Sequence, residues 1–140
     1  PRVPRIAAIV LAAGQSRRTG SVNKLLADIK GTPMSKIVLQ EVLKAEVYSV
    51  FVVTGFEKER VESVLFHEKV TFIANPNFKK GLSTSLIAGL NSLPKHIDGV
   101  LICLGDMPKI KTQHINSLIA AFNLSLNIES FKNWDFLIKI

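Results

Sequence analysis

The stretch that decides the fold is IVLAAGQSRRTGSVNKLL, residues 9–26, near the start of the 140-residue chain. Its first half is an apolar run of strand length that stops at Gly14. Its second half holds another glycine, Gly20, with two arginines and the pair Asn23-Lys24. Glycines let the backbone approach a ligand closely, and successive N–H groups can bind phosphate oxygens. The stretch therefore predicts a buried strand followed by a phosphate-binding loop; a solvated turn with incidental charge is the alternative.

Strand-like and helix-like segments alternate along the rest of the chain. Short β-branched or aromatic runs predict strands, and apolar residues at helical spacing predict helices. The expected strands are residues 5–12, 48–53, 70–74 and 98–104, and the expected helices are residues 34–45, 57–65, 83–93 and 112–122. Ser83 or Thr84 is the expected N-cap of the third helix. The alternation predicts a Rossmann-like, doubly wound α/β fold with a mainly parallel sheet and helices on both faces.

The domain organisation follows the same pattern. Residues 1–122 are expected to form one α/β domain, because they contain neither an internal repeat nor a linker. Residues 123–140 form a separate C-terminal segment without a helical period, in which residues 134–140 are a candidate strand.

Composition excludes several classes of protein. A hydrophobic fraction of 47% argues against disorder. No apolar run approaches the ~18–20 residues of a membrane span, and none resembles a signal peptide, so a cytoplasmic location is expected. The net charge is +7, but the basic residues are scattered and aromatics are only 7%, which argues against a nucleic-acid binder. The one cysteine, Cys103, lies in a buried-strand pattern and is expected in the core.

Glycine or polar residues follow each expected strand. They are the Gly14–Gly20 loop, Thr54-Gly55, Asn75-Pro76 and Gly105-Asp106. In open α/β sheets, ligands bind at the carboxyl ends of the strands, near the point where the strand order reverses. The four features are therefore expected to meet at one edge of the sheet and to form the site.

The spacing of the loop excludes two familiar phosphate-binding motifs. Gly20 is followed by Ser-Val where a Walker A motif needs Lys-Ser/Thr, and Gly14-Gln15-Ser16 breaks the G-x-G of a dinucleotide fingerprint. The residue types still favour phosphate. Arg18 offers a planar fork that matches phosphate geometry, Lys24 offers a mobile point charge, and Ser16 adds a hydroxyl donor.

Four segments in order give the chain a specific resemblance. They are Leu11-Ala12-Ala13-Gly14-x-Ser16-x-Arg18-x-Gly20-x-x-Asn23-Lys24-Leu25-Leu26, Val53-Thr54-Gly55, Asn75-Pro76 with Gly81-Leu82-Ser83-Thr84-Ser85-Leu86 and Gly89, and Gly105-Asp106-Met107-Pro108. This pattern resembles the small nucleotidyltransferases of molybdenum cofactor maturation, within the nucleoside-diphospho-sugar transferase-like fold. The spelling Ala12-Ala13-Gly14 is more like the cytidylyltransferase branch than the guanylyltransferase branch, which usually reads Ala-Gly-Gly.

The resemblance implies an activity and a set of site residues. The activity is Mg²⁺-dependent transfer of a nucleoside monophosphate, with CTP favoured over GTP, to a molybdopterin-type cofactor, with release of pyrophosphate and with a molybdoenzyme as recipient of the product. Arg18, Lys24 and Asp106 would be catalytic, and Asp106 would hold Mg²⁺. The nucleotide would be bound by Leu11, Ala12, Ala13, Gly14, Ser16, Arg18, Gly20, Lys24, Thr54, Gly55, Asn75 and Ser83. A turn-forming aspartate is the local alternative for Asp106.

The sequence departs from the family pattern at two places. Thr19 stands where methionine is usual, and residues 123–140 do not contain the segment that usually brings a second metal-binding aspartate. Two readings follow: an altered or truncated C-terminus of an active enzyme, or a nucleotide-binding module without catalysis. Transfer to a sugar phosphate or another phosphorylated acceptor is a further alternative.

Overall fold

The computed structural model describes residues 3–15, 23–126 and 137–139 of the chain. In chain order the elements are β1 (Ile6–Ala12), the 3-10 turn η2 (Lys24–Leu26), β2 (Asp28–Ile29), β3 (Thr32–Pro33), α1 (Met34–Lys44), β4 (Ser49–Thr54), α2 (Lys58–Leu65), β5 (Val70–Ala74), the 3-10 turn η3 (Phe78–Lys80), α3 (Leu82–Asn91), β6 (Gly99–Leu104), α4 (Thr112–Leu126) and β7 (Leu137–Lys139). No helix in these ranges is long and apolar enough to cross a membrane.

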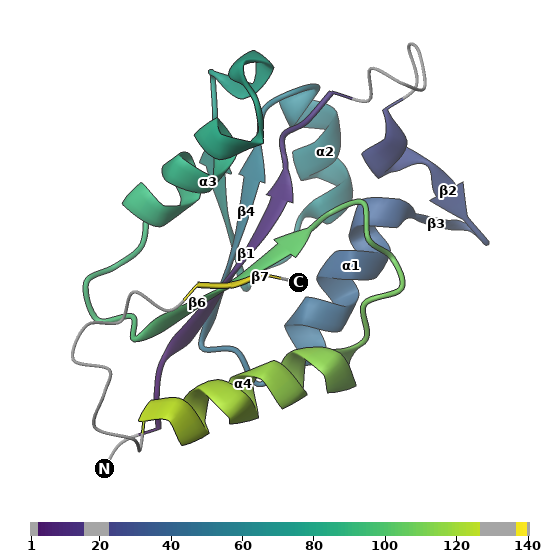
Figure 1. Ribbon diagram of the computed structural model, residues 1–140. Coiled ribbons are helices and arrows are strands. Elements are labelled where there is room, and N and C mark those ends of the chain that lie inside the picture. Colours follow the sequence, from purple (N-terminus) through teal and green to yellow (C-terminus); the bar gives the residue numbers. More distant parts are fainter. Residues whose placement is uncertain (1–2, 16–22, 127–136, 140) are drawn as a thin grey trace.

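One parallel sheet forms the centre of the molecule, with strand order β5-β4-β1-β6-β7. All seven residues of β1 are buried, because β4 and β6 pair with its two edges and helices cover its two faces. Figure 1 shows α3 on one side of the sheet and α1 and α4 on the other. The predicted parallel α/β fold is confirmed.

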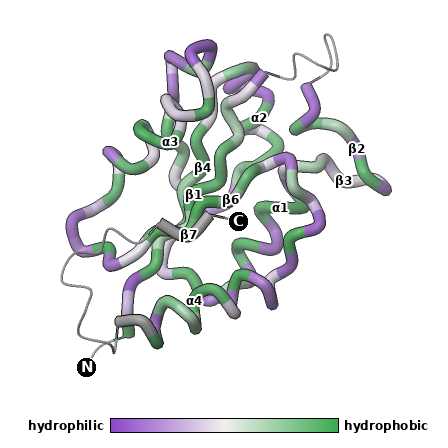
Figure 2. Tube along the Cα trace, viewed as in Figure 1, coloured by the Kyte–Doolittle hydropathy of each residue, from purple (hydrophilic) through white to green (hydrophobic). Residues whose placement is uncertain are grey.

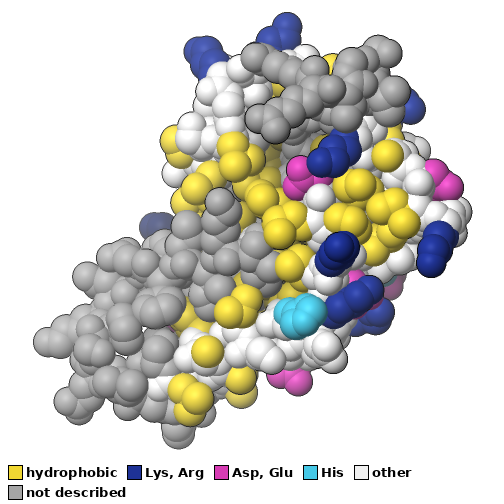
Figure 3. All heavy atoms as spheres, turned by 45° about the vertical axis from the view of Figure 1, so that its right-hand side comes forward, with side chains coloured by type: hydrophobic (Ala, Val, Ile, Leu, Met, Phe, Trp, Pro, Cys, Tyr) yellow, Lys and Arg dark blue, Asp and Glu magenta, His cyan; other side chains and the backbone are white. Residues whose placement is uncertain are grey.

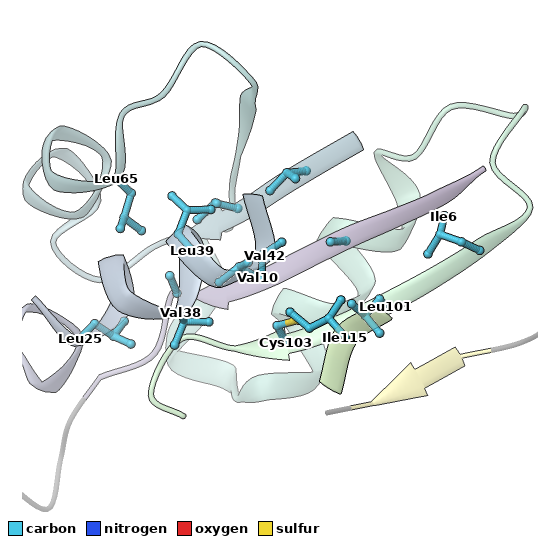
Figure 4. Packing of buried hydrophobic residues seen from close by; sticks show 14 of the residues in the cluster. Ile6, Val10, Leu25, Val38, Leu39, Val42, Leu65, Leu101, Cys103 and Ile115 are labelled. Atoms are coloured by element: carbon cyan, nitrogen blue, oxygen red, sulfur yellow. The ribbon is translucent and has the colours of Figure 1, made fainter. Parts of the chain in front are cut away.

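Alternate residues of β1 enter two separate hydrophobic clusters. Ile6, Ala8, Val10 and Ala12 pack with side chains from α1, α2 and α4, whereas Ala7, Ile9 and Leu11 pack with side chains from α3. Figure 4 shows the first cluster, in which Val42 of α1 lies near Val10 of β1, and Ile115 of α4 lies near Cys103 of β6. The hydropathy of the chain follows this division, since the strands form the greenest part of the tube in Figure 2. Cys103 is fully buried, as expected.

The strand ends meet at one edge of the sheet. Ala12 is paired with Thr54, Thr54 with Ala74, and Leu11 with Leu104. Because the strands are parallel, the segments that follow them leave the sheet side by side. The chain runs from β1 outward to β4 and β5 and then returns to β6 on the other side of β1, so the strand order reverses beside β1. This is where a ligand site is expected in such folds.

The structure corrects some of the predicted element bounds. α4 continues to Leu126, past the predicted helix end at residue 122, and β7 confirms the core of the strand predicted at residues 134–140. The division of the chain at residue 122 stays a prediction. The β2–β3 hairpin was not predicted; its turn places Lys30 and Gly31 at positive φ angles.

Candidate nucleotide site

A pocket of about 660 Å³ lies at the carboxyl edge of the sheet. This volume is within the range of small-molecule sites, about 300–1,000 Å³. Its described lining comprises Leu11, Ala13, Gly14, Gln15, Lys24, Leu25, Phe78, Lys79, Lys80, Gly81, Leu82, Ser85, Leu104 and Asp106. Most of its buried members are apolar, and it carries three lysines against one aspartate, which favours an anionic ligand with an apolar part.

The end of β1 forms the first wall. Leu11 and Ala13 are buried and lead into Gly14, and a Cβ atom added at Gly14 would meet nothing within 4 Å. Gly14 is exposed, and its backbone lines the pocket without a side chain to cover it. The predicted site residues Ser16, Arg18 and Gly20 lie outside the described residues.

The turn η2 carries Lys24 to the pocket. Its shape is fixed from both sides: the Oδ1 atom of Asn23 accepts a hydrogen bond from the Leu25 N–H at 3.1 Å, and the Ser35 hydroxyl donates to the Leu25 carbonyl at 2.7 Å. Asn23 and Ser35 are both buried, so these bonds are shielded from water. Lys24 consequently extends from a rigid base, although its own side chain is about half exposed.

Asp106 lies across from Lys24, directly after β6. The Gly105 N–H donates to the Leu11 carbonyl at 3.0 Å, which brings this turn against the end of β1. The Nζ atom of Lys24 and the Oδ2 atom of Asp106 are 3.9 Å apart, and the two side chains are 48% and 46% exposed. An ion pair this long and this open to solvent contributes little stability. Both side chains line the pocket and expose about half of their surface to solvent.

The segment after β5 forms the opposite wall, which the site prediction largely missed. It comprises η3, with Phe78, Lys79 and Lys80, and the start of α3, with Gly81, Leu82 and Ser85. The signal that could have found it is the pair Lys79-Lys80 directly before a glycine and a helix. Figure 3 shows one face of the molecule, on which lysine and arginine side chains lie around a hydrophobic centre.

The predicted N-cap of α3 is wrong. The helix begins at Leu82, and its N-cap is Gly81, whose φ of 112° favours glycine. Ser83 is exposed and is absent from the described lining, whereas Ser85, two residues later and so on a different face of the helix, is buried and lines the pocket.

The match to a known family decides what kind of site this is. The family model described as the MobA-like NTP transferase domain matches residues 8–128. The chain belongs to this family. Its members are nucleotidyltransferases, and membership of an NTP transferase family implies a nucleoside triphosphate as substrate.

Two curated proteins illustrate the relationship of this nucleotidyltransferase to its family. The purine catabolism protein PucB of Bacillus subtilis is 29% identical over 138 residues, which are 93% of this chain and 67% of that protein. The bifunctional protein GlmU of Francisella philomiragia is 38% identical over 116 residues, which are 81% of this chain and 25% of that protein. The chain thus spans about two thirds of the first relative and a quarter of the second.

Solved structures share the fold. Rv0371c from Mycobacterium tuberculosis has a TM-score of 0.77 at 21% identity, with 88% of this chain and 62% of that one covered. A nucleotidyl transferase from Methanothermobacter has a TM-score of 0.72 at 28% identity, with 83% and 57% covered. Rv0371c has also been solved in complex with manganese, with a TM-score of 0.71 at 19% identity.

Four predicted residues of the nucleotidyltransferase site lie behind the described lining. Ala12 is buried in the core, and the Thr54 hydroxyl, also buried, donates to Oε2 of Glu62 at 2.6 Å. A Cβ at Gly55 would come within 2.8 Å of the Cβ of Phe78, so Gly55 lets β4 pack closely against the pocket wall. Asn75 is buried and bonded to neighbouring protein groups. The side chains of Ala12, Thr54 and Asn75 are thus used inside the protein.

Proposed function

We propose that the chain is a Mg²⁺-dependent cytidylyltransferase that moves CMP from CTP to a molybdopterin-type cofactor and releases pyrophosphate. The observation that carries the proposal is the pairing of Lys24 with Asp106 at the pocket, 3.9 Å apart and both half exposed. A cation for phosphate oxygens and a carboxylate for a hard metal ion are the two charges that nucleotidyl transfer requires at the α-phosphate.

The pocket residues would have two roles: apolar residues would position the nucleotide, and basic residues would neutralise its charge. The apolar lining, which includes Leu11, Leu25 and Leu104, would hold the base and the sugar away from water. The bare backbone at Gly14 would lie against the triphosphate, and Lys24, with Arg18 from the same loop, would neutralise the charge that builds on it during transfer. The attacking group is a phosphate of the acceptor, which is already anionic, so no side chain needs to be activated as a nucleophile.

Among the described residues that line the pocket, Asp106 is the one carboxylate that could bind magnesium. Among the described residues no group of three or more His, Cys, Asp or Glu side chains could hold a metal by itself. Magnesium is usually held by one or two carboxylates together with substrate phosphates, so a single half-exposed carboxylate beside a phosphate-binding wall fits this ion. When bound, the ion would supply positive charge that draws electron density from the phosphoryl oxygens.

The choice of CTP and of the acceptor comes from the sequence pattern. Ala12-Ala13-Gly14 resembles the cytidylyl branch of the family. A molybdoenzyme is the proposed recipient of the product, because the resemblance extends to proteins of molybdenum cofactor maturation. Transfer to a sugar phosphate is the competing activity on the same fold.

A thermal-shift panel of CTP, GTP, ATP and UTP, each with and without Mg²⁺, tests the proposal. A ligand that binds only the folded state raises the melting temperature. We expect the largest rise with CTP and Mg²⁺, and its loss in Asp106→Ala. Asp28→Ala, at an exposed hairpin carboxylate outside the described lining, is the control that keeps the response to CTP.

Indifference to all four nucleotides would contradict nucleotide binding altogether. Pyrophosphate release on addition of molybdopterin cofactor then tests transfer itself. Release with a sugar phosphate instead would favour the competing activity, and binding without release would favour a non-catalytic nucleotide-binding module.

A further inference from the structure

Asn75 joins three segments at the end of β5. Its side chain is 3% exposed and makes three hydrogen bonds of 2.9 Å each. Oδ1 accepts from the Asn77 N–H, and Nδ2 donates to the hydroxyls of Thr84 and Ser85 in the first turns of α3. One buried amide thus ties the strand end, the loop that leads to η3 and the helix together.

The orientation of this amide is determined by its neighbours. The Asn77 N–H can only donate, so the atom that faces it must be the amide oxygen. The amide nitrogen therefore faces the two hydroxyls, and both of its hydrogens are used. Asn75 has no donor left for a bound nucleotide, although the sequence pattern placed it among the nucleotide-binding residues.

The orientation of the Asn75 amide determines how the hydroxyl group of Ser85 is used. An amide nitrogen can only donate, so the Ser85 oxygen accepts from Asn75 and its own hydrogen must point elsewhere. Ser92 and Ser117 direct their hydrogens to the carbonyl four residues earlier in their helices. No such bond from Ser85 occurs within the described part of the chain, and Ser85 lines the pocket while being 3% exposed.

We propose that Asn75 is a positioning residue, which acts through Ser85. It holds the Ser85 oxygen from behind, so that the hydroxyl hydrogen is presented to an acceptor atom on the base or sugar of the nucleotide. It also fixes the wall that carries Phe78, Lys79 and Lys80, because Asn77 and Thr84 flank this wall. The proposal rests on the nucleotide binding proposed above.

Asn75→Asp tests the polarity of this arrangement at almost constant shape. A carboxylate still accepts from the Asn77 N–H, but it accepts from the Ser85 hydroxyl as well and so turns that hydrogen away from the pocket. We expect the Kd for CTP with Mg²⁺, measured by calorimetry, to rise about tenfold, as for the loss of one hydrogen bond. Because Asn75 is only 3% exposed, the buried charge should also lower the melting temperature, so the binding test is repeated with Ser85→Ala, which adds no charge.

Two further variants make the test specific. Ser85→Ala should raise the Kd by a similar factor, and the double variant Asn75→Asp/Ser85→Ala should be no worse than either single variant, because both remove the same donor. Asn77→Asp places the same negative charge two residues away on an exposed side chain, and it should bind CTP like the wild type.

The outcomes separate this inference from the proposed function. A wild-type protein that binds no nucleotide overturns the proposed function. Wild-type binding with an unchanged Kd in Ser85→Ala overturns the inference, even where Asn75→Asp does not fold. Additive losses in the double variant also overturn it, since Asn75 would then act independently of Ser85. An equal loss in Asn77→Asp would assign the effect to charge and likewise reject the positioning role.

Discussion

At the scale of single residues, two glycines of the site have opposite reasons to be glycine. A Cβ at Gly105 would lie 3.0 Å from the Leu11 carbonyl oxygen and 3.1 Å from Cδ2 of Leu25, whereas a Cβ at Gly14 would meet nothing within 4 Å. The first glycine is required by packing within the protein. The second lines the pocket and has open space next to it.

The substitutions Gly105→Ala and Gly14→Ala should therefore separate stability from binding. We expect Gly105→Ala to lower the free energy of unfolding by about 1–3 kcal/mol, because Leu11 and Leu25 must shift. Gly14→Ala should change it by about 0.5 kcal/mol or less and should still weaken CTP binding, since it adds a methyl group at a residue that lines the pocket. Urea unfolding and calorimetry measure the two effects. A stable Gly105→Ala protein would contradict the tight packing of this turn.

At the scale of elements, Glu41 connects the end of α1 to the start of α4. Its Oε1 atom accepts hydrogen bonds from the Thr112 N–H at 3.0 Å and the Thr112 hydroxyl at 3.1 Å, and Oε2 lies 2.8 Å from the Nζ atom of Lys44. The hydrogen bond from Lys44, followed by that from the Thr112 backbone, lowers the pKa of Glu41 from 4.5 to about 2. The carboxylate thus takes the place of an N-cap for α4.

This lowered pKa predicts a pH dependence of stability. A carboxyl group whose pKa is lower in the folded state stabilises the fold fully above pH 4.5, and the contribution is lost as the pH falls from 4.5 toward 2. We expect Glu41→Gln to cost about 1–2 kcal/mol at pH 7 and to show less pH dependence in that window. Glu59→Gln, at an exposed position of α2, is the matched control. Identical pH profiles for Glu41→Gln and the wild type would refute this role.

At the scale of the whole molecule, Cys103 reports on the integrity of the core. It lies in β6 between β1 and β7, is fully buried, and burial raises the pKa of its thiol to about 12. The thiolate is the reactive form, so reaction with a thiol reagent at pH 8 requires exposure of the strand. The reagent can reach Cys103 when the sheet unfolds.

We therefore expect the Cys103 thiol to react with a disulfide reagent only as fast as the protein unfolds. The labelling rate should rise with urea in parallel with loss of the circular dichroism signal, and CTP with Mg²⁺ should slow it by stabilising the folded state. Labelling much faster than global unfolding would mean instead that β6 opens locally.

The sequence by itself determined the fold and the edge of the sheet at which the pocket lies. Apolar runs separated by helical spacing are enough to specify parallel β–α–β units, and parallel strands bring every following loop to one edge. Lys24 and Asp106, which the family resemblance assigned to one site, line the same pocket with their charged atoms 3.9 Å apart. The segments that these residues belong to also specified the family.

Only the tertiary structure decided which polar side chains after β5 face the pocket and which bond within the protein. Asn75 looks like a ligand residue in the sequence, but its partners come from the loop and helix that fold back onto β5, and they use all the hydrogens of its amide. Ser83 and Ser85 are equivalent in composition, and the helix start at Leu82 buries one at the pocket and exposes the other. Hydrogen-bond direction and burial depend on neighbours distant in the chain, so local pattern does not contain them.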